Sequence, residues 1–172
     1  PKVLSNPALS QDSRLQAATV FGGSSLLYDS QVWIEIKGGE YAALQSYWVR
    51  LHRVVLRQRW NDCDPHAPPT DQEILSFSGA HPVWLLIRWR RLLYFSRLIR
   101  HGPIFVLAWL QHAHELGCPW HRDLVNDIAA LRDLVPALSE LPPPSESLQE
   151  WVSLASDYPA QWRIYVKRAR AS

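Results

Sequence analysis

The sequence predicts an all-α protein, and three observations lead to that prediction. Apolar residues recur at intervals of three and four in at least five segments, which places them on one face of an α-helix. No segment shows the sustained alternation of apolar and polar residues that marks a half-buried strand. Of the 172 residues, 47% are hydrophobic, which is enough to offset the conformational entropy that folding removes. We therefore expect helices packed around a hydrophobic core.

The first helix is expected from about residue 10 to residue 28, and Gly22 and Gly23 are expected to kink or split it. Residues 32–36 (VWIEI) follow and alternate as a short strand does, although an extended linker fits them equally well. The N-terminal segment is therefore predicted to be helical up to a short non-helical connection.

The second helix, from about Glu40 to Arg57, has the clearest pattern in the chain. Its apolar residues form one stripe along the helix: Tyr41, Leu44, Trp48, Leu51 and Val55. Arg50, Arg53 and Arg57 lie on the opposite side. This helix is therefore predicted to bury one face and to expose a cationic one.

Residues 60–69 (WNDCDPHAPP) are predicted to form a loop because of their prolines and acidic residues. Thr70 and Glu73 then have the spacing of a helix capping box. Pro82 is a favourable first residue for a long apolar helix, which is expected to end at Arg100, before a Gly-Pro pair.

Three further helical segments are expected toward the C-terminus. They are a helix over about 103–116, a helix marked by Leu124, Ile128, Leu131 and Val135, and a final helix from Pro159 that carries Trp162 and Val166. The proline-rich residues 136–146 are predicted to be a linker, and Ser147 with Glu150 repeats the spacing of a capping box.

The basic residues are segregated from the acidic ones. The net charge is only +2, but 15 of the 18 basic residues are Arg, and thirteen basic residues lie in three stretches without any Asp or Glu. Arg forms forked hydrogen bonds that match phosphate oxygens, and Arg-rich helix faces suit nucleic-acid backbones. The candidate nucleic-acid-binding residues are Arg50, Arg53, Arg57, Arg59, Arg88, Arg90, Arg97, Arg100, Arg163, Lys167, Arg168 and Arg170. The alternative interpretation is that these residues are solvated faces that keep a Trp-rich helical protein in solution.

No catalytic motif is present in the sequence. It has no Gly-rich phosphate loop, no paired carboxylates for two-metal chemistry, and no nucleophile elbow. Cys63 with His66 and Cys118 with His121 form two CxxH pairs, but their separation matches no zinc-site spacing, so we expect no bound metal. The two cysteines and the lack of a signal peptide favour a reduced intracellular setting, nuclear or cytoplasmic, and the apolar runs are too short to cross a membrane.

Residues 14–59 resemble the region just after the polymerase palm in reverse transcriptases of non-LTR retrotransposons. In that family a helix ends in Ser followed by Leu-Leu-Tyr, a Trp comes shortly after, and a second helix ends in an Arg-rich stretch. The matching residues are Ser25, Leu26, Leu27, Tyr28, Trp33, Tyr47, Arg50, Leu51, Arg53 and Val54. Asp29 departs from the family, which usually has Gly after the Tyr. Residues 88–103 (RWRRLLYFSRLIRHGP) also resemble the helical tail beyond the thumb in some of these elements.

The resemblance implies that residues 1–59 are a thumb-like helical segment. The loop at 60–69 would lead to a helical C-terminal region at 70–135, and the linker at 136–146 to terminal helices at 147–172. The implied function is non-catalytic binding of primer–template, or of the element's RNA or DNA, with the upstream palm as partner domain. The chain has no Met and begins at Pro1, so we expect a piece of a longer product. No cofactor is expected here, since Mg²⁺ would belong to the palm.

The rival prediction is a helical protein–protein interaction module without a nucleic-acid role. Its Arg faces would then bind acidic protein surfaces or only solvate the chain.

Overall fold

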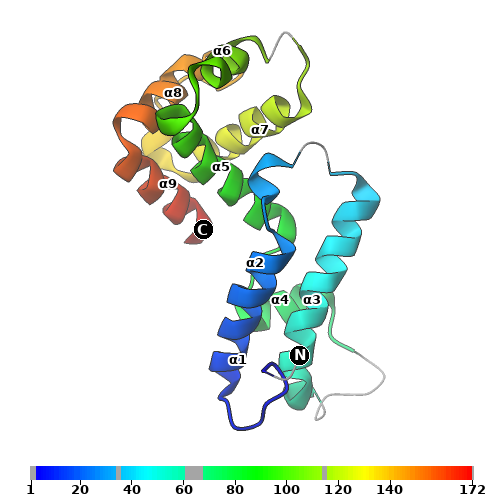
Figure 1. The fold of residues 1–172 in the computed structure, drawn as a ribbon. Coiled ribbons are helices and arrows are strands. Elements are labelled where there is room, and N and C mark those ends of the chain that lie inside the picture. Colours follow the sequence, from blue (N-terminus) through cyan, green and yellow to red (C-terminus); the bar gives the residue numbers. More distant parts are fainter. Residues whose placement is uncertain (1–2, 34–35, 61–67, 114–115, 172) are drawn as a thin grey trace. The chain divides into compact units, whose positions relative to one another are not determined.

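The computed structural model describes residues 3–33, 36–60, 68–113 and 116–171, without the side chains of residues 57–60, 107 and 111 (Figure 1). All regular structure in these residues is helical, so the predicted all-α class is confirmed. A 3-10 turn at Ser30–Val32 and an extended Trp33 stand at the start of the VWIEI segment, so its described part forms no strand. None of the described helices has the length and apolar character needed to span a bilayer.

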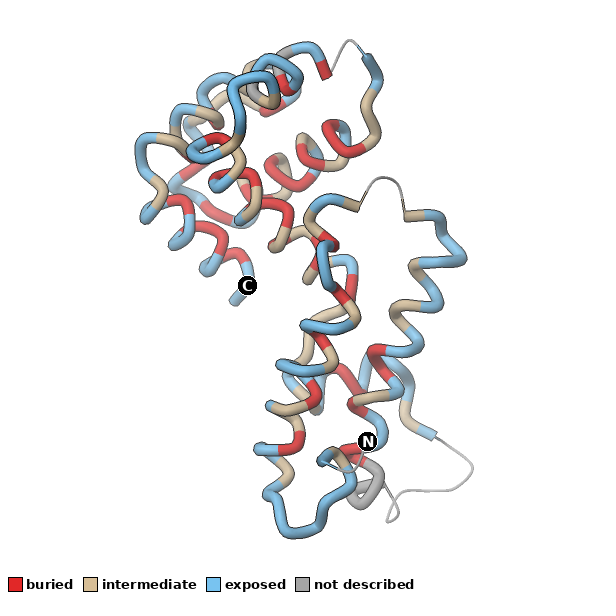
Figure 2. Tube along the Cα trace, viewed as in Figure 1, coloured by how far each residue is buried: buried red, intermediate tan, exposed pale blue. Residues whose placement is uncertain are grey.

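The chain divides into two compact units. The first unit comprises the described residues of 1–28 and 36–86, and the second comprises those of 29–35 and 87–172. Each unit has its own buried residues, which are coloured red along its helices in Figure 2.

The first unit consists of α1 (Gln11–Ala17), a π-helical turn (Ala18–Gly22), α2 (Gly23–Leu26), α3 (Gly38–Trp60) and α4 (Asp71–Ser78). The predicted capping box at the start of α4 is confirmed. The Thr70 hydroxyl accepts a hydrogen bond from the Glu73 N–H, and the Glu73 carboxylate accepts one from the Thr70 N–H. Gly79 ends α4 in the left-handed conformation with φ 63°.

Gly22 and Gly23 do not split the first helical segment as predicted. The chain continues through the π-helical turn into α2, with both glycines in right-handed helical conformation. Their role is close packing, because a Cβ on Gly22 would come within 2.5 Å of the Leu51 side chain, and one on Gly23 within 3.4 Å of Trp48. These glycines allow the first helical segment to approach α3.

The buried face of α3 is rotated relative to the predicted stripe. Trp48 and Val55 are buried as expected, but Tyr41, Leu44 and Leu51 are only half-buried. The remaining buried positions are Val49, His52 and Leu56. The prediction from the spacing of apolar residues missed this rotation because it placed the polar His52 at the surface.

Trp48 joins α3 to the chain between α4 and the next helix. Its ring is completely buried, and its indole N–H donates a hydrogen bond of 2.9 Å to the His81 carbonyl oxygen. Replacing Trp48 with Ala is expected to reduce the free energy of unfolding by about 3 to 5 kcal/mol, because it removes the ring and leaves a cavity. Urea denaturation followed by circular dichroism measures this loss. A decrease below about 1 kcal/mol would contradict the central position of Trp48.

His52 is completely buried and lies one turn after Trp48. Its Nδ1–H donates to the Trp48 carbonyl oxygen at 3.0 Å, and its ring centroid lies 4.4 Å from that of Trp48. Among the described residues, no group makes a hydrogen bond with the buried Nε2 atom. Burial lowers the pKa of His52, with the Trp48 carbonyl opposing that shift, so the native state favours the neutral ring.

The lowered pKa of His52 predicts how the stability of the protein depends on pH. Below about pH 6.5 the unfolded chain binds a proton at His52 that the native state still excludes, so stability falls as the pH falls. We expect His52→Asn, which keeps a donor near the Nδ1 position, to lose less stability than the wild type between pH 7.5 and pH 5. Urea denaturation across this range tests it. Parallel stability profiles for the two proteins would be the contradictory result.

The second unit contains most of α5 (Val83–His101), followed by α6 (Ile104–His112), α7 (Pro119–Leu134), α8 (Leu148–Asp157) and α9 (Pro159–Ala171). The predicted apolar positions of α7 and α9 are buried: Leu124, Ile128, Leu131, Val135, Trp162 and Val166. α6 ends at His112, four residues before its predicted end. α9 packs on α5, where the Trp162 indole N–H donates to the Leu92 carbonyl oxygen at 2.8 Å and the Trp162 ring contacts Phe95.

The proline-rich segment between α7 and α8 accepts hydrogen bonds from side chains of both helices. The guanidinium of Arg132 donates to the carbonyl oxygens of Leu141 and Ser139 at 2.9 and 3.0 Å. The Trp151 indole N–H donates to the Pro142 carbonyl oxygen at 3.0 Å. The predicted second capping box is wrong, because the Ser147 side chain makes no capping hydrogen bond although Ser147 precedes α8.

Candidate nucleic-acid interface

Arg50 and Arg53, the described arginines of the predicted cationic side of α3, are exposed, as the sequence predicts. Arg50 lies opposite the buried residues, and Arg53 lies at their edge. Arg53 also forms an ion pair of 3.0 Å with Asp71 on α4, in which both side chains are about half exposed. Such a surface pair contributes little stability and can be exchanged for a phosphate contact. Arg57 and Arg59 lie on α3, but their side chains are outside the described part of the structure.

The second arginine stretch, on α5, separates into a structural and an exposed part. Arg91 is buried and donates to the carboxylate of Asp127 at 2.7 Å, and it also lies 3.4 Å from a carboxylate oxygen of Asp123. Arg88 donates to the other oxygen of Asp127 at 3.1 Å. The guanidinium of Arg88 is therefore engaged inside the protein, which leaves it less available to a phosphate than the sequence suggested.

The rest of this stretch is more accessible. Arg97 and Arg100 are exposed in the last two turns of α5. Arg90 is half-buried, and its burial lowers the pKa of its guanidinium. Arg97 and Arg100 are thus the residues of this stretch best placed to meet an external anion.

The acidic partners on α7 were missed in the sequence. Asp127 lies within the buried stripe of α7, three residues after Leu124 and four before Leu131. Burial raises the pKa of Asp127, and the neighbouring charges of Arg91 and Arg88 oppose that shift. A carboxylate at an apolar position of a helix is the signal that could have indicated a buried ion pair.

The third basic stretch covers the exposed side of α9. Trp162, Tyr165, Val166 and Ala169 are buried, whereas Arg163, Lys167, Arg168 and Arg170 are exposed. Arg163, Lys167 and Arg170 follow helical spacing and share one face. Arg170 also places its guanidinium carbon 5.3 Å from the centroid of the buried Trp89 ring, a cation–π contact. Trp89 is therefore a core residue rather than a stacking surface.

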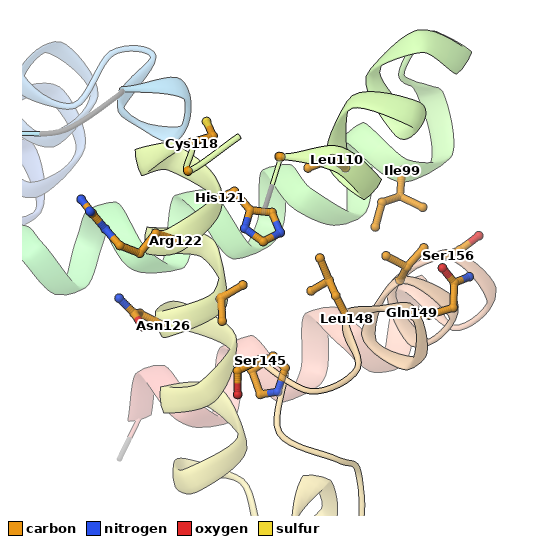
Figure 3. Close-up of a pocket in the computed structure, with 15 residues that line it drawn as sticks. Ile99, Leu110, Cys118, His121, Arg122, Asn126, Ser145, Leu148, Gln149 and Ser156 are labelled. Atoms are coloured by element: carbon orange, nitrogen blue, oxygen red, sulfur yellow. The ribbon is translucent and has the colours of Figure 1, made fainter. Parts of the chain in front are cut away.

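A pocket of about 750 Å³ lies in the second unit, lined by residues of α5, α6, α7, α8 and the segment before α8 (Figure 3). Figure 3 shows the side chains of His121 and Leu148 directed toward this space from α7 and from α8. Its described lining combines aliphatic and polar side chains and includes no Asp or Glu. A pocket of this size can hold a small molecule.

Cys118 and His121, the second CxxH pair, both line this pocket. Over the described residues, no three His, Cys, Asp or Glu side chains are grouped as metal ligands. Cys63 and His66 lie outside the described residues, so the predicted absence of zinc stays a prediction.

Comparison with protein-family models, with curated proteins and with solved structures found no match for this chain.

The buried ion pair makes a prediction for stability. In Arg91→Met, Asp127 keeps only Arg88 as its close partner, and we expect a loss of about 3 to 5 kcal/mol in the free energy of unfolding. The matched control is Arg97→Gln on the exposed side of the same helix, which is expected to change stability by less than about 0.5 kcal/mol. Urea denaturation compares the two variants. Equal midpoints would show that the Arg91–Asp127 pair does not stabilise the second unit.

Proposed function

We propose that this chain is a non-catalytic nucleic-acid-binding part of a reverse transcriptase of the non-LTR retrotransposon type. It comprises the thumb and the C-terminal region beyond the palm. Its exposed arginines contact the phosphate backbone of a primer–template or of the element's own RNA or DNA. Phosphate contacts position a protein on its duplex without reading bases, so binding is expected to depend weakly on sequence.

The observation that carries this proposal is the two-sided character of α3. The buried residues around Trp48 occupy one side of α3, while Arg50 is exposed opposite them and Arg53 is exposed at their edge. These arginines are not needed to form the core, so their charge is available to a ligand. Arg is the side chain best suited to paired hydrogen bonds with phosphate oxygens.

The backbone at Asp29 gives the resemblance further support. Asp29 stands where family members usually have Gly, and its φ of 53° is the left-handed conformation. Gly adopts this conformation without steric cost, and Asp is one of the few other residues that tolerate it. A position that requires this conformation accounts for both the Gly of the family and the Asp of this chain.

The exposed side of α9 and the end of α5 supply further phosphate contacts in this proposal. Arg163, Lys167 and Arg170 present three cations along one helix face, and Arg97 and Arg100 lie exposed on α5. Arg88 contributes less because its guanidinium is paired with Asp127. The upstream palm would hold the catalytic Mg²⁺, so the isolated chain is expected to extend no primer.

A helical interaction module remains the second candidate. The observation that favours it is the apolar surface on the first unit, where Val20, Phe21 and Tyr28 are all exposed. Exposed aromatic and aliphatic side chains of this kind mark protein contacts. In the first proposal the palm would cover them, and in the second a separate partner protein would.

The salt dependence of binding separates the two candidates. We expect the wild type to bind a generic RNA–DNA hybrid with an affinity that falls steeply as salt rises. The double variant Arg50→Gln, Arg53→Gln should bind every sequence more weakly, and its plot of log affinity against log salt should be flatter by up to about 1.8, or about 0.9 for each lost contact. Fluorescence anisotropy with a labelled hybrid measures both quantities. Stability should remain within about 1 kcal/mol of the wild type.

Lys37→Gln is the matched control, because it removes an exposed positive charge of the first unit that is outside the proposed face. It should leave the salt slope nearly unchanged. If the double variant keeps the affinity and slope of the wild type, α3 does not contact phosphates, and the interaction module takes first place.

A further inference from the structure

Exposed aromatic and aliphatic side chains gather on α6 in the second unit. The exposed fraction is 85% for Ile104, 69% for Phe105 and 38% for Trp109. Phe105 and Trp109 are four residues apart on one helix, so their rings lie on the same face. Phe105 and Trp109 thus place two exposed aromatic rings on one face of a surface helix, a feature that can bind a ligand.

The ring of Trp109 packs against a buried ring of α7. Its centroid lies 6.3 Å from that of Trp120 on α7, with an angle of 43° between the two planes. Trp120 is buried, and its indole N–H donates to the Gln31 carbonyl oxygen at 2.9 Å. Trp109 therefore rests on a fixed ring, and a ligand that stacks on it finds a surface that is already ordered.

Exposed arginines lie on the helix that precedes these rings. Arg97 and Arg100 are exposed at the end of α5, and only four residues separate Arg100 from Phe105, so their Cα atoms are at most about 18 Å apart. The sequence contains no Asp or Glu between Glu73 and Glu115. The surface thus combines exposed rings with arginines on the segment that leads into α6.

We propose that the exposed rings of Phe105 and Trp109, together with Arg97 and Arg100, form a binding surface for single-stranded nucleic acid. Unpaired bases stack on the rings, and the arginines contact the phosphates of the same strand. Bases in a duplex are stacked on one another and cannot reach the rings, so the surface prefers a single strand. This inference rests on the proposed nucleic-acid role and adds a second binding mode to the phosphate contacts of α3.

The experiment compares a labelled 12-nucleotide RNA with an RNA–DNA hybrid of the same sequence by fluorescence anisotropy. Phe105→Ala is expected to weaken single-strand binding about 5- to 150-fold, the range reported for the loss of one stacked base. It should leave hybrid binding and the salt slope unchanged, because no charge is removed.

Phe105→Trp should retain the affinity for the single strand, since it keeps a ring. Arg100→Gln should instead flatten the single-strand salt slope by about 0.7.

Phe77→Ala is the matched control, because Phe77 is an exposed ring of the first unit, on α4. It should leave single-strand affinity unchanged. Because Phe105 is highly exposed, the Ala variant is expected to remain folded, and circular dichroism checks it.

Single-strand affinity that is equal in Phe105→Ala and in the wild type would overturn this inference. The proposed function would survive that result if the Arg50 and Arg53 variant still weakened hybrid binding. A wild type that binds neither nucleic acid would refute both proposals. Binding to vesicles that contain phosphatidylserine, lost in Phe105→Ala and accompanied by no single-strand binding, would assign the surface to an anionic membrane and would also overturn the inference.

Discussion

Buried tryptophans whose indole N–H groups reach backbone carbonyl oxygens hold each unit together. In the first unit Trp48 donates to His81. In the second unit Trp120, Trp151 and Trp162 donate to Gln31, Pro142 and Leu92. Each ring supplies a large buried apolar area, and each N–H must find a partner when it leaves water. One side chain therefore both fills the core and fixes the position of a second segment.

The arginines follow the same requirement that a buried polar group has a hydrogen-bond partner. Near the core, the guanidinium of Arg91 is paired with the Asp127 carboxylate, and that of Arg132 donates to carbonyl oxygens. The arginines on the outer sides of α3 and α9 face no such constraint. The arginine-rich composition thus contains two populations with different roles. Those inside the units determine the fold, and those outside determine the surface field that an anionic ligand meets.

The helices and most core positions could be predicted because each helix repeats its apolar residues with helical spacing. Leu124, Ile128 and Leu131 on α7 are examples. Three features could not be predicted, since they depend on partners distant in sequence. His52 is buried because its ring packs on Trp48, Gly22 packs closely against the Leu51 side chain of α3, and Arg88 is engaged because Asp127 lies opposite. Of the candidate site, the exposure of Arg50 and Arg53 follows from the pattern, but the rings of α6 do not, because Phe105 and Trp109 look like core residues in an apolar sequence.

The separation between structural and surface residues bears on how binding and folding relate in this protein. Arg50 and Arg97 project from helices that also carry buried rings, and Phe105 projects from α6, where Trp109 packs on the buried Trp120, so a ligand meets side chains on an ordered backbone. Ordering a flexible segment would reduce the affinity, and a prearranged helix avoids that cost. The two modes of contact also differ physically, since phosphate contacts weaken with salt and ring stacking does not. A protein that carries both can hold a paired and an unpaired stretch of one nucleic acid by independent forces, as a junction between a duplex and its single-stranded template requires.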